Sequence, residues 1–283
     1  MSYFYDLLKG LKIPLYFTSM APVIYLFVYS NYRHPLYFLS ILFIVIVIQL
    51  ALNLSMDFYD YSNNLGLENG DTLFPVGPYL IYRMGKKPET LKRLFIISIF
   101  LGIISGLFLI YITGKYILIL IGVLAVFLSL IYVIPPFKLD SRGLGEISTF
   151  FSFGPFIVLG YSIVLNIKIS FLIVSISVLF GLLASAIRFL HHIPEDNPQG
   201  IRVRHFKLIY SIMLLSGFII QVYDIYLFLL LLPALLLSIY HILKLDRNPV
   251  NISRKTNQIV GIQVLSTLLL IVSIILVPCI QIV

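Results

Sequence analysis

The sequence predicts an all-α, polytopic membrane protein, and three observations support this fold class. Of its 283 residues, 60% are hydrophobic and only 11% are charged, and the mean hydropathy of +1.02 lies far above that of a soluble domain. Nine apolar runs follow one another along the chain. The number of lysines and arginines alternates between high and low in the successive segments that join these runs. Because no polar stretch is long enough for a soluble domain, residues 1–283 are predicted to form a single transmembrane domain.

Each of the nine runs approaches the roughly 20 residues that a helix needs to cross about 30 Å of hydrocarbon. The runs cover residues 13–30, 36–56, 94–113, 116–134, 145–165, 169–190, 206–222, 225–243 and 259–282. The prolines at positions 135 and 136 are expected to end the fourth run, because proline cannot continue the helical hydrogen-bond ladder. Pro88 is expected near the first position of the helix that becomes the third run.

The distribution of basic residues predicts the orientation in the membrane. Seventeen of the 20 lysines and arginines fall in the N-terminal segment and in every second loop after it, and three fall in the remaining loops. By the positive-inside rule, the N-terminus then lies inside and the C-terminus outside. The connections on the inside are also the long ones, so the active-site loops of a multi-pass cell-membrane protein are expected on the cytoplasmic side.

Charge and cysteine content exclude several other classes of protein. The formal net charge is +8, but the basic residues lie in short loops between apolar runs and not on a soluble face that would suit nucleic acid. Anionic lipid headgroups or a diphosphate substrate are better partners. Cys279 is the only cysteine, which excludes an internal disulfide and a thiolate metal cluster.

The first candidate site lies at the end of the second apolar run. Asn53, Asp57 and Asp60 stand at i, i+4 and i+7, so a helix that continues through them places all three on one face. Acids at membrane depth are costly, and a pair of carboxylates suits Mg²⁺, which completes its shell with water and substrate phosphate. The alternative is a solvated helix end, because charges often mark a membrane boundary.

The second candidate site follows the sixth apolar run. Pro194 is expected to end that helix, which leaves Glu195 and Asp196 on a loop at its inside mouth. In a functional interpretation these acids hold a second Mg²⁺ while Arg202 and Arg204 bind phosphate oxygens. A polar loop with offsetting charges is the alternative.

The third stretch joins the fourth and fifth runs. It contains Tyr132, a double proline, Lys138, Arg142 and then Gly-Leu-Gly-Glu at 143–146 and Phe-Gly-Pro at 153–155. The glycines permit a tight turn, which holds Lys138 and Arg142 over the same inside mouth. Taken alone, this stretch is better explained as a simple loop.

The order of the three stretches resembles the UbiA superfamily of intramembrane aromatic prenyltransferases, specifically the 1,4-dihydroxy-2-naphthoate polyprenyltransferase branch of menaquinone biosynthesis. The most specific part is Tyr-x-x-Pro-Pro-x-Lys, Gly-Leu-Gly-Glu and Phe-Gly-Pro between residues 132 and 155. The acidic stretch at 53–60 resembles the family's first acidic motif. Met56 replaces the usual Asn, Asn64 replaces a third Asp, and Gln199 follows Glu195 where the second motif normally has Asp.

The resemblance implies nine helices around a central cavity and an Mg²⁺-dependent transfer of a polyprenyl group from a polyprenyl diphosphate to an aromatic quinone precursor. The expected metal ligands are Asp57, Asp60, Glu195 and Asp196. The expected catalytic residues are Asp57, Asp60, Tyr132 and Lys138, and the expected substrate-binding residues are Asn53, Asn64, Lys138, Arg142, Arg202 and Arg204. A non-catalytic lipid-binding paralogue or a transporter of the same fold is the alternative. The scarcity of acids within the runs argues against a transporter.

The orientation is testable by chemical labelling. In a Cys279→Ser background, a cysteine introduced near Thr72 is expected to react only with reagent on the cytoplasmic side, and one near Tyr116 only with reagent outside, because the charge split places these loops on opposite sides. Labelling in the reverse pattern would contradict the predicted orientation.

Overall fold

The protein is all-helical over the residues that the computed structural model describes, which are 3–32, 34–64, 66, 75, 77–134, 136–139, 143–193, 200–246 and 255–280, and they contain no strand. In chain order the helices are α1 (Tyr3–Gly10), η1 (Ile13–Leu15), α2 (Tyr16–Tyr29), α3 (Pro35–Ser62), α4 (Tyr79–Tyr82), α5 (Pro88–Thr113), α6 (Ile117–Val133), α7 (Gly145–Phe153), α8 (Pro155–Val164), α9 (Phe171–His192), α10 (Ile201–Arg204), α11 (Phe206–Ile219), η4 (Ile220–Tyr223), α12 (Ile225–Lys244) and α14 (Thr256–Ile280).

As far as their residues are described, all nine predicted apolar runs fall on helices or on consecutive helix pairs. Within the described residues, seven helical segments are long and apolar enough to cross a membrane, and the pair formed by α1 and the segment Ile13–Tyr29, bent by 43°, makes an eighth if it is counted as one span. The apolar helix α6 is shorter, at Ile117–Val133. These segments agree with a multi-pass membrane protein, while nine crossings and the side of the N-terminus stay predictions.

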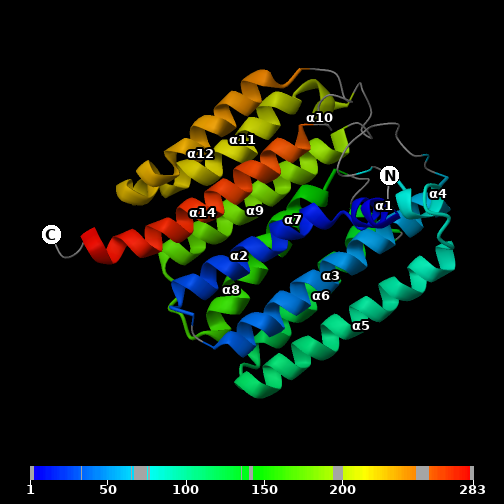
Figure 1. The fold of residues 1–283 in the computed structure, drawn as a ribbon, viewed down its shortest axis with the longest axis horizontal. Helices are drawn as coiled ribbons and strands as arrows, with labels where there is room; N and C mark the ends of the chain where they lie inside the picture. Colours follow the sequence, from blue (N-terminus) through cyan, green and yellow to red (C-terminus); the bar gives the residue numbers. More distant parts are fainter. Residues whose placement is uncertain are drawn as a thin grey trace.

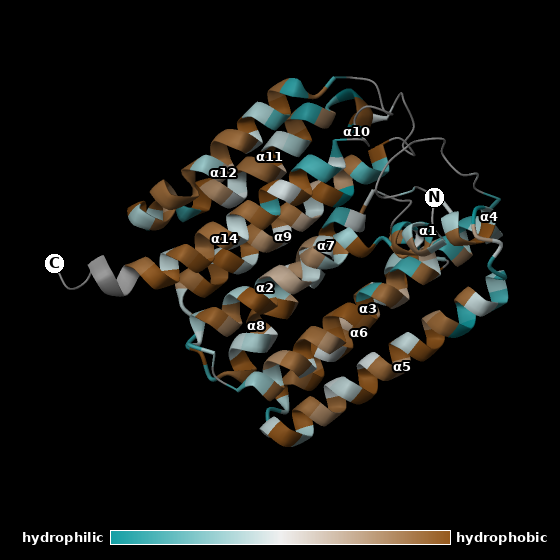
Figure 2. Ribbon diagram, in the orientation of Figure 1, coloured by the Kyte–Doolittle hydropathy of each residue, from teal (hydrophilic) through white to brown (hydrophobic). Residues whose placement is uncertain are grey.

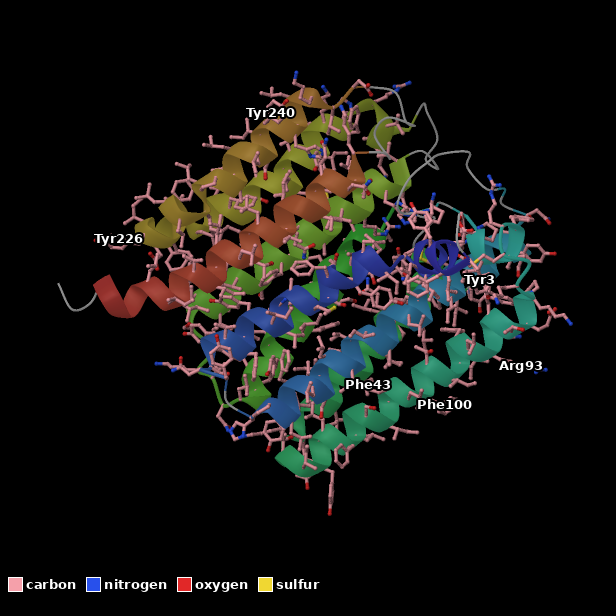
Figure 3. The ribbon with its side chains drawn as sticks, viewed as in Figure 1. Tyr3, Phe43, Arg93, Phe100, Tyr226 and Tyr240 are labelled. Carbon is pink, nitrogen blue, oxygen red and sulfur yellow. The ribbon has the colours of Figure 1, made fainter. Side chains whose placement is uncertain are left out.

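The long helices lie side by side in one bundle, and α1, α4 and α10 gather at the same end of it (Figure 1). Apolar residues cover the middle of the helices, and the polar residues concentrate at the end that carries α1, α4 and α10 (Figure 2). Large side chains such as Phe43, Phe100 and Tyr226 point outward (Figure 3), with exposed fractions of 46%, 60% and 65%. An apolar outer surface of this kind suits a lipid environment and not water.

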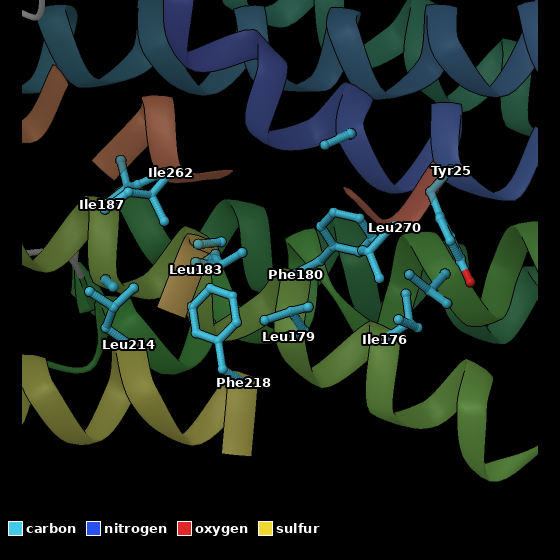
Figure 4. Close-up of a cluster of buried hydrophobic side chains, with 14 of the residues drawn as sticks. Tyr25, Ile176, Leu179, Phe180, Leu183, Ile187, Leu214, Phe218, Ile262 and Leu270 are labelled. Carbon is cyan, nitrogen blue, oxygen red and sulfur yellow. The ribbon is translucent and has the colours of Figure 1, made fainter. Parts of the chain in front are cut away.

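Helix α9 forms the centre of the main core. In the most apolar window of this helix 72% of the residues are buried, compared with 22% in α3 and α5. Phe180 and Leu183 of α9 pack between Phe218 of α11, Ile262 of α14 and their neighbours (Figure 4). Because α9 is buried from Leu183 to His192, polar side chains near its end are held within protein and not in lipid.

The acidic motif is helical throughout, as predicted, because α3 extends to Ser62. Helix α5 begins at Pro88, which occupies the first turn as expected. The run 145–165, in contrast, is divided between α7 and α8 at Gly154. Pro155 cannot donate a backbone hydrogen bond, and a Cβ at Gly154 would lie 2.2 Å from the carbonyl oxygen of Ser177 in α9. The break therefore lets α7 and α8 approach the backbone of α9 closely.

This close approach predicts a stability difference between two glycines. Gly154→Ala is expected to lower the free energy of unfolding by about 1–3 kcal/mol, because the added methyl group meets backbone atoms that cannot move aside. In the control Gly106→Ala, the methyl group meets nothing within 4 Å in α5, and the helix propensity of alanine predicts an unchanged or slightly raised stability. Denaturant unfolding in detergent micelles measures both, and equal effects would contradict the packing argument.

Candidate active site

The first acidic residue of the motif, Asp57, is enclosed by the N-terminal segment and α4. Asp57 is 0% exposed. The ammonium Nζ of Lys12 lies 3.9 Å from its Oδ1, and the backbone N–H of Leu80 in α4 donates to its Oδ2 at 2.9 Å. Lys12 is itself buried and adopts a left-handed backbone conformation between α1 and η1. One carboxylate thus joins the N-terminal segment, α3 and α4.

Asn53 supports the same junction from one turn earlier in α3. Its side-chain Nδ2 donates to the carbonyl oxygen of Leu11 at 3.0 Å. At the same junction, the hydroxyl of Tyr79 in α4 donates to Asp6 in α1 at 3.1 Å. Burial raises the pKa of the Tyr79 hydroxyl, and the Asp6 carboxylate that accepts its hydrogen bond raises it further. The predicted substrate-binding residue Asn53 is therefore tied to the backbone of the N-terminal segment.

The second acid of the motif, Asp60, pairs with a different lysine, Lys138. Asp60 lies 3.7 Å from the Nζ of Lys138, measured to Oδ1, and only 7% of the residue is exposed. Lys138 follows α6 with a positive φ of 36°. Asn64, which follows the end of α3, is exposed and also left-handed. The structure therefore brings Asp60 and Lys138 together, and it leaves Asn64 at the surface.

A second charged group lies where α6, α7, α9 and α10 meet. Glu146 in the first turn of α7 accepts hydrogen bonds at its Oε1 from Arg188 of α9 and from Arg202 of α10, the latter at 2.8 Å. Arg188 also donates from Nε to the hydroxyl of Tyr132 at 2.7 Å, and its guanidinium lies over the Tyr132 ring. Two of the predicted residues, Tyr132 and Arg202, are thus linked through residues that were not predicted.

A cavity of about 100 Å³ lies among α2, α3, α6, α7 and α9 and connects the two charged groups. Lys12 and Arg188 both line it, together with Tyr132. The other lining residues are apolar, hydroxyl, amide or imidazole side chains: Leu15, Thr18, Gln49, Leu52, Met56, Ser129, Ser148, Thr149, Ser152, Phe153, Ala184, Ile187, His191 and His192. The described lining therefore has cationic groups and hydroxyls on apolar walls, and no carboxylate.

The remaining predicted residues are placed as follows. Arg204 is exposed at the end of α10. Arg142, Glu195 and Asp196 lie outside the described residues. Among the side chains that the structure describes, no group of three or more His, Cys, Asp or Glu is close enough to hold a metal ion.

The residues present nevertheless fit a cation at Asp57. Its Oδ1 is buried and accepts no hydrogen bond, although Lys12 stands nearby. A buried carboxylate oxygen without a hydrogen bond is costly unless a positive charge faces it. Asp57 and Asp60, which follow one another along α3, are therefore the described residues suited to Mg²⁺, a hard cation that prefers carboxylate oxygen.

Sequence reasoning did not identify the roles of Lys12, Glu146 and Arg188. Lys12 was counted only as a topological signal. Arg188 stands within an apolar run, where a charged residue is expected to have a function and a partner, and this signal was available. Its pairing with Glu146 joins residues 42 positions apart, which no local pattern reveals.

Comparison with known proteins supports the predicted resemblance. No protein-family model matches the chain. The chain is 28% identical over 196 residues to the 2-carboxy-1,4-naphthoquinone phytyltransferase of Arabidopsis thaliana chloroplasts, covering 65% of this chain and 49% of the relative. It is 29% identical over 168 residues to the 1,4-dihydroxy-2-naphthoate octaprenyltransferase of Bacillus subtilis strain 168, covering 58% and 52%.

The matched regions thus cover only about half the length of these curated relatives. A solved structure of a digeranylgeranylglyceryl phosphate synthase in membranes superposes with a TM-score of 0.64 at 16% identity, over 95% of this chain and 99% of the other. This superposition shows a shared fold. The resemblance to naphthoate prenyltransferases of the UbiA type is confirmed by the two relatives, at low identity.

The buried contact between Lys12 and Asp57 predicts a specific pattern of stability. Lys12→Met is expected to lower the free energy of unfolding by about 3–5 kcal/mol, because it leaves a buried carboxylate without its cation. Adding Asp57→Asn is expected to recover most of this loss, because the amide oxygen still accepts from Leu80 and carries no charge. Lys168→Met, at an exposed loop position, is the control and is expected to change stability by less than about 0.5 kcal/mol. Additive losses in the double variant, measured by denaturant unfolding in micelles, would contradict the pairing.

Proposed function

We propose that this protein transfers a polyprenyl group from a polyprenyl diphosphate to an aromatic quinone precursor within the membrane, with Mg²⁺ as cofactor. The observation that carries the proposal is the cavity between the two charged groups, because its walls bring Lys12 and Arg188 to either side of an apolar space. The similarity to a 2-carboxy-1,4-naphthoquinone phytyltransferase and a 1,4-dihydroxy-2-naphthoate octaprenyltransferase supports the choice of substrates. The protein would be a multi-pass protein of the cell membrane with this site toward the cytoplasmic side.

In this proposal Asp57 and Asp60 hold Mg²⁺. The ion would neutralise the negative charge that develops on the departing diphosphate. Glu195 and Asp196, on the segment after α9, are proposed to anchor a second ion. Lys138 lies at Asp60 and is positioned to contribute a further positive charge to the phosphate oxygens. Arg202 and Arg204 in α10 are proposed to bind phosphate at the same end of the bundle, and Arg142 is proposed to bind phosphate as well.

The cavity walls have a separate role. Met56, Ile187 and Phe153 present apolar surface, which lowers the water content around an allylic cation and so protects it from hydrolysis. The hydrogen bond from Arg188 fixes Tyr132 at the wall. When the bond between the allylic carbon and the diphosphate oxygen breaks, the diphosphate leaves with the electron pair of that bond. A ring carbon of the acceptor forms the new bond to the prenyl group, and the ring then becomes aromatic again by losing what this carbon carried, a proton or a carboxyl group as CO₂.

One observation favours a second candidate, a lipid-binding paralogue without catalysis. Asp57 already faces the ammonium of Lys12, and Asp60 faces that of Lys138. Both acids of the first motif thus face a cation that the protein itself supplies, and neither acid needs a metal ion to offset its charge. The two candidates differ in whether a transfer product forms.

The deciding experiment incubates purified protein with Mg²⁺, a polyprenyl diphosphate and a panel of hydroxylated naphthoate and benzoate acceptors, with products identified by mass spectrometry. Asp57→Asn and Asp60→Asn are each expected to lower turnover by about 10²- to 10³-fold, because each removes a carboxylate that holds the Mg²⁺ ion which stabilises the leaving group. The double variant is expected to be scarcely worse than either single one, since the two residues act as a unit.

The control variant is Glu89→Gln, an exposed residue in the first turn of α5, which is expected to keep wild-type turnover. Undiminished turnover in either aspartate variant would remove the metal role. Wild-type protein that binds a polyprenyl diphosphate but forms no product with any acceptor would favour the lipid-binding paralogue.

A further inference from the structure

A dense group of cations lies where α4 joins α5. Glu89 is the one acid between positions 83 and 93, and five of these residues are basic: Arg83, Lys86, Lys87, Lys92 and Arg93. These five residues are called the α4–α5 basic surface below. All of them except the partly buried Lys86 are exposed. Within the described part of the chain, none of the five forms an ion pair with a carboxylate. One carboxylate does not offset five cations, so this surface has a positive potential.

A tight turn between the two helices brings these cations together. The N–H of Gly85 donates to the carbonyl oxygen of Ile81 at 3.0 Å, and the N–H of Lys86 donates to that of Leu80 at 3.0 Å. Gly85 has a positive φ of 63°, a conformation that glycine adopts without strain. Helix α5 then begins at Pro88. The cations before and after the turn therefore belong to one short segment between two helix ends.

The outer face of α5 continues from this surface as an apolar stripe. Arg93, Ile97, Phe100 and Ile104 stand at i, i+4, i+7 and i+11, so they share one face of the helix. The three apolar members are strongly exposed, and Arg93 lies toward the end of α5 that is near α4 (Figure 3). At about 1.5 Å per residue, the stripe extends about 16 Å below Arg93. This is about half of the roughly 30 Å of hydrocarbon in a bilayer, and therefore about one leaflet.

Exposed aromatic residues of α1 lie beside the same cations. The Nζ of Lys86 donates to the hydroxyl of Tyr3 at 2.8 Å and stands 5.4 Å from the centroid of its ring. Phe4 and Tyr82 are also exposed. Aromatic side chains are enriched at the level of the lipid headgroups, where one end of the ring meets hydrocarbon and the other meets water. Cations and exposed aromatics thus meet at the top of a lipid-facing stripe.

We propose that the α4–α5 basic surface binds the headgroups of anionic phospholipids whose acyl chains cover the outer face of α5. A lipid fits better than a soluble anion, because the apolar stripe begins one turn below Arg93 and requires an apolar partner. Clustered lysines and arginines at a membrane surface each favour an anionic headgroup. This inference goes beyond the proposed reaction and does not depend on it. The surface is built next to Leu80, whose N–H binds Asp57, so the lipid would contact the element that holds the acidic motif.

The test uses tryptophan fluorescence, because the chain has no tryptophan of its own. Ile97→Trp places a reporter one turn below Arg93, and Ile225→Trp places a control at the start of α12, where the native side chain has the same exposed fraction of 52%. Each full-length variant is reconstituted into phosphatidylcholine bilayers that contain either brominated phosphatidylglycerol or brominated phosphatidylcholine. Bromine quenches a tryptophan that it contacts, so the two quenching curves give the relative affinity of the adjacent site for the two headgroups.

At Ile97→Trp, phosphatidylglycerol is expected to bind about tenfold more tightly than phosphatidylcholine, because several cations face its phosphate. At Ile225→Trp the two lipids are expected to bind equally within about twofold. Raising the salt concentration from about 0.1 M to about 1 M shortens the Debye length from about 10 Å to about 3 Å and is expected to reduce the preference at Ile97→Trp.

Charge variants then locate the preference. In the Ile97→Trp background, Lys87→Gln combined with Arg93→Gln is expected to lower the preference for phosphatidylglycerol to below about threefold. The matched control combines Lys207→Gln in α11 with Lys244→Gln in α12, which are exposed and remove the same charge from other helices. This control is expected to keep the tenfold preference.

Three results would overturn the inference. The first is equal quenching by the two lipids at Ile97→Trp, and the second is an equal preference at both reporters, which would reflect the bilayer and not this surface. The third is loss of the preference when glycerol 3-phosphate is added to the buffer, which would indicate a site for soluble phosphate. If the charge variants fail to fold, the comparison of the two reporters and the salt dependence still decide. None of these measurements requires turnover, so they stand apart from failure of the proposed function.

Discussion

The fold depends on one electrostatic requirement, which is that a charged side chain among apolar helices must face an opposite charge. At α3 this requirement is met by Lys12 and Asp57, both buried. Removing one partner of such a pair destabilises a protein by much more than the intact pair stabilises it. Since the N–H of Leu80 also reaches Asp57, the N-terminal segment and α4 are both fixed to α3 through this carboxylate. The polar end of the bundle is thus organised from within α3.

The same requirement shapes the site that we propose for the diphosphate. Among the described residues, four cations, Lys12, Lys138, Arg188 and Arg202, face three carboxylates, Asp57, Asp60 and Glu146. Each of these seven side chains thus has an opposite charge within 4 Å.

The sequence predicted the helices well because their signals are local. The apolar runs have the length of a membrane span, and Pro88 begins a helix as its fixed φ requires. The break at Gly154 was not predicted, because its cause is the backbone of α9, far along the chain. The positions of Asp57 and Asp60 on one helix were also predictable, since a helix fixes which residues share a face.

The partners of those residues were not predictable in the same way. Lys12 is a short distance along the chain from the first apolar run and reads as an ordinary topological charge, and only the left-handed turn after α1 brings it to Asp57. Arg188 stood out as a charge within an apolar run, but nothing local pointed to Glu146 as the acid that pairs with it. Long-range pairs of this kind depend on helix packing, which residue spacing along one helix does not encode.

The two charged groups also explain why the end of the bundle that carries them differs from the rest. Tertiary pairing lets the protein keep Asp57 and Arg188 buried and Glu146 only 15% exposed, where water would otherwise be needed to solvate them. A cavity between such groups has fixed charges that need no solvent reorganisation when a substrate arrives, and this is the arrangement that stabilises a developing charge most effectively. Well-packed apolar side chains would stabilise the bundle as well as these buried charges do. Packing alone therefore does not explain why the charges are there, whereas a site that binds and orients an anion does.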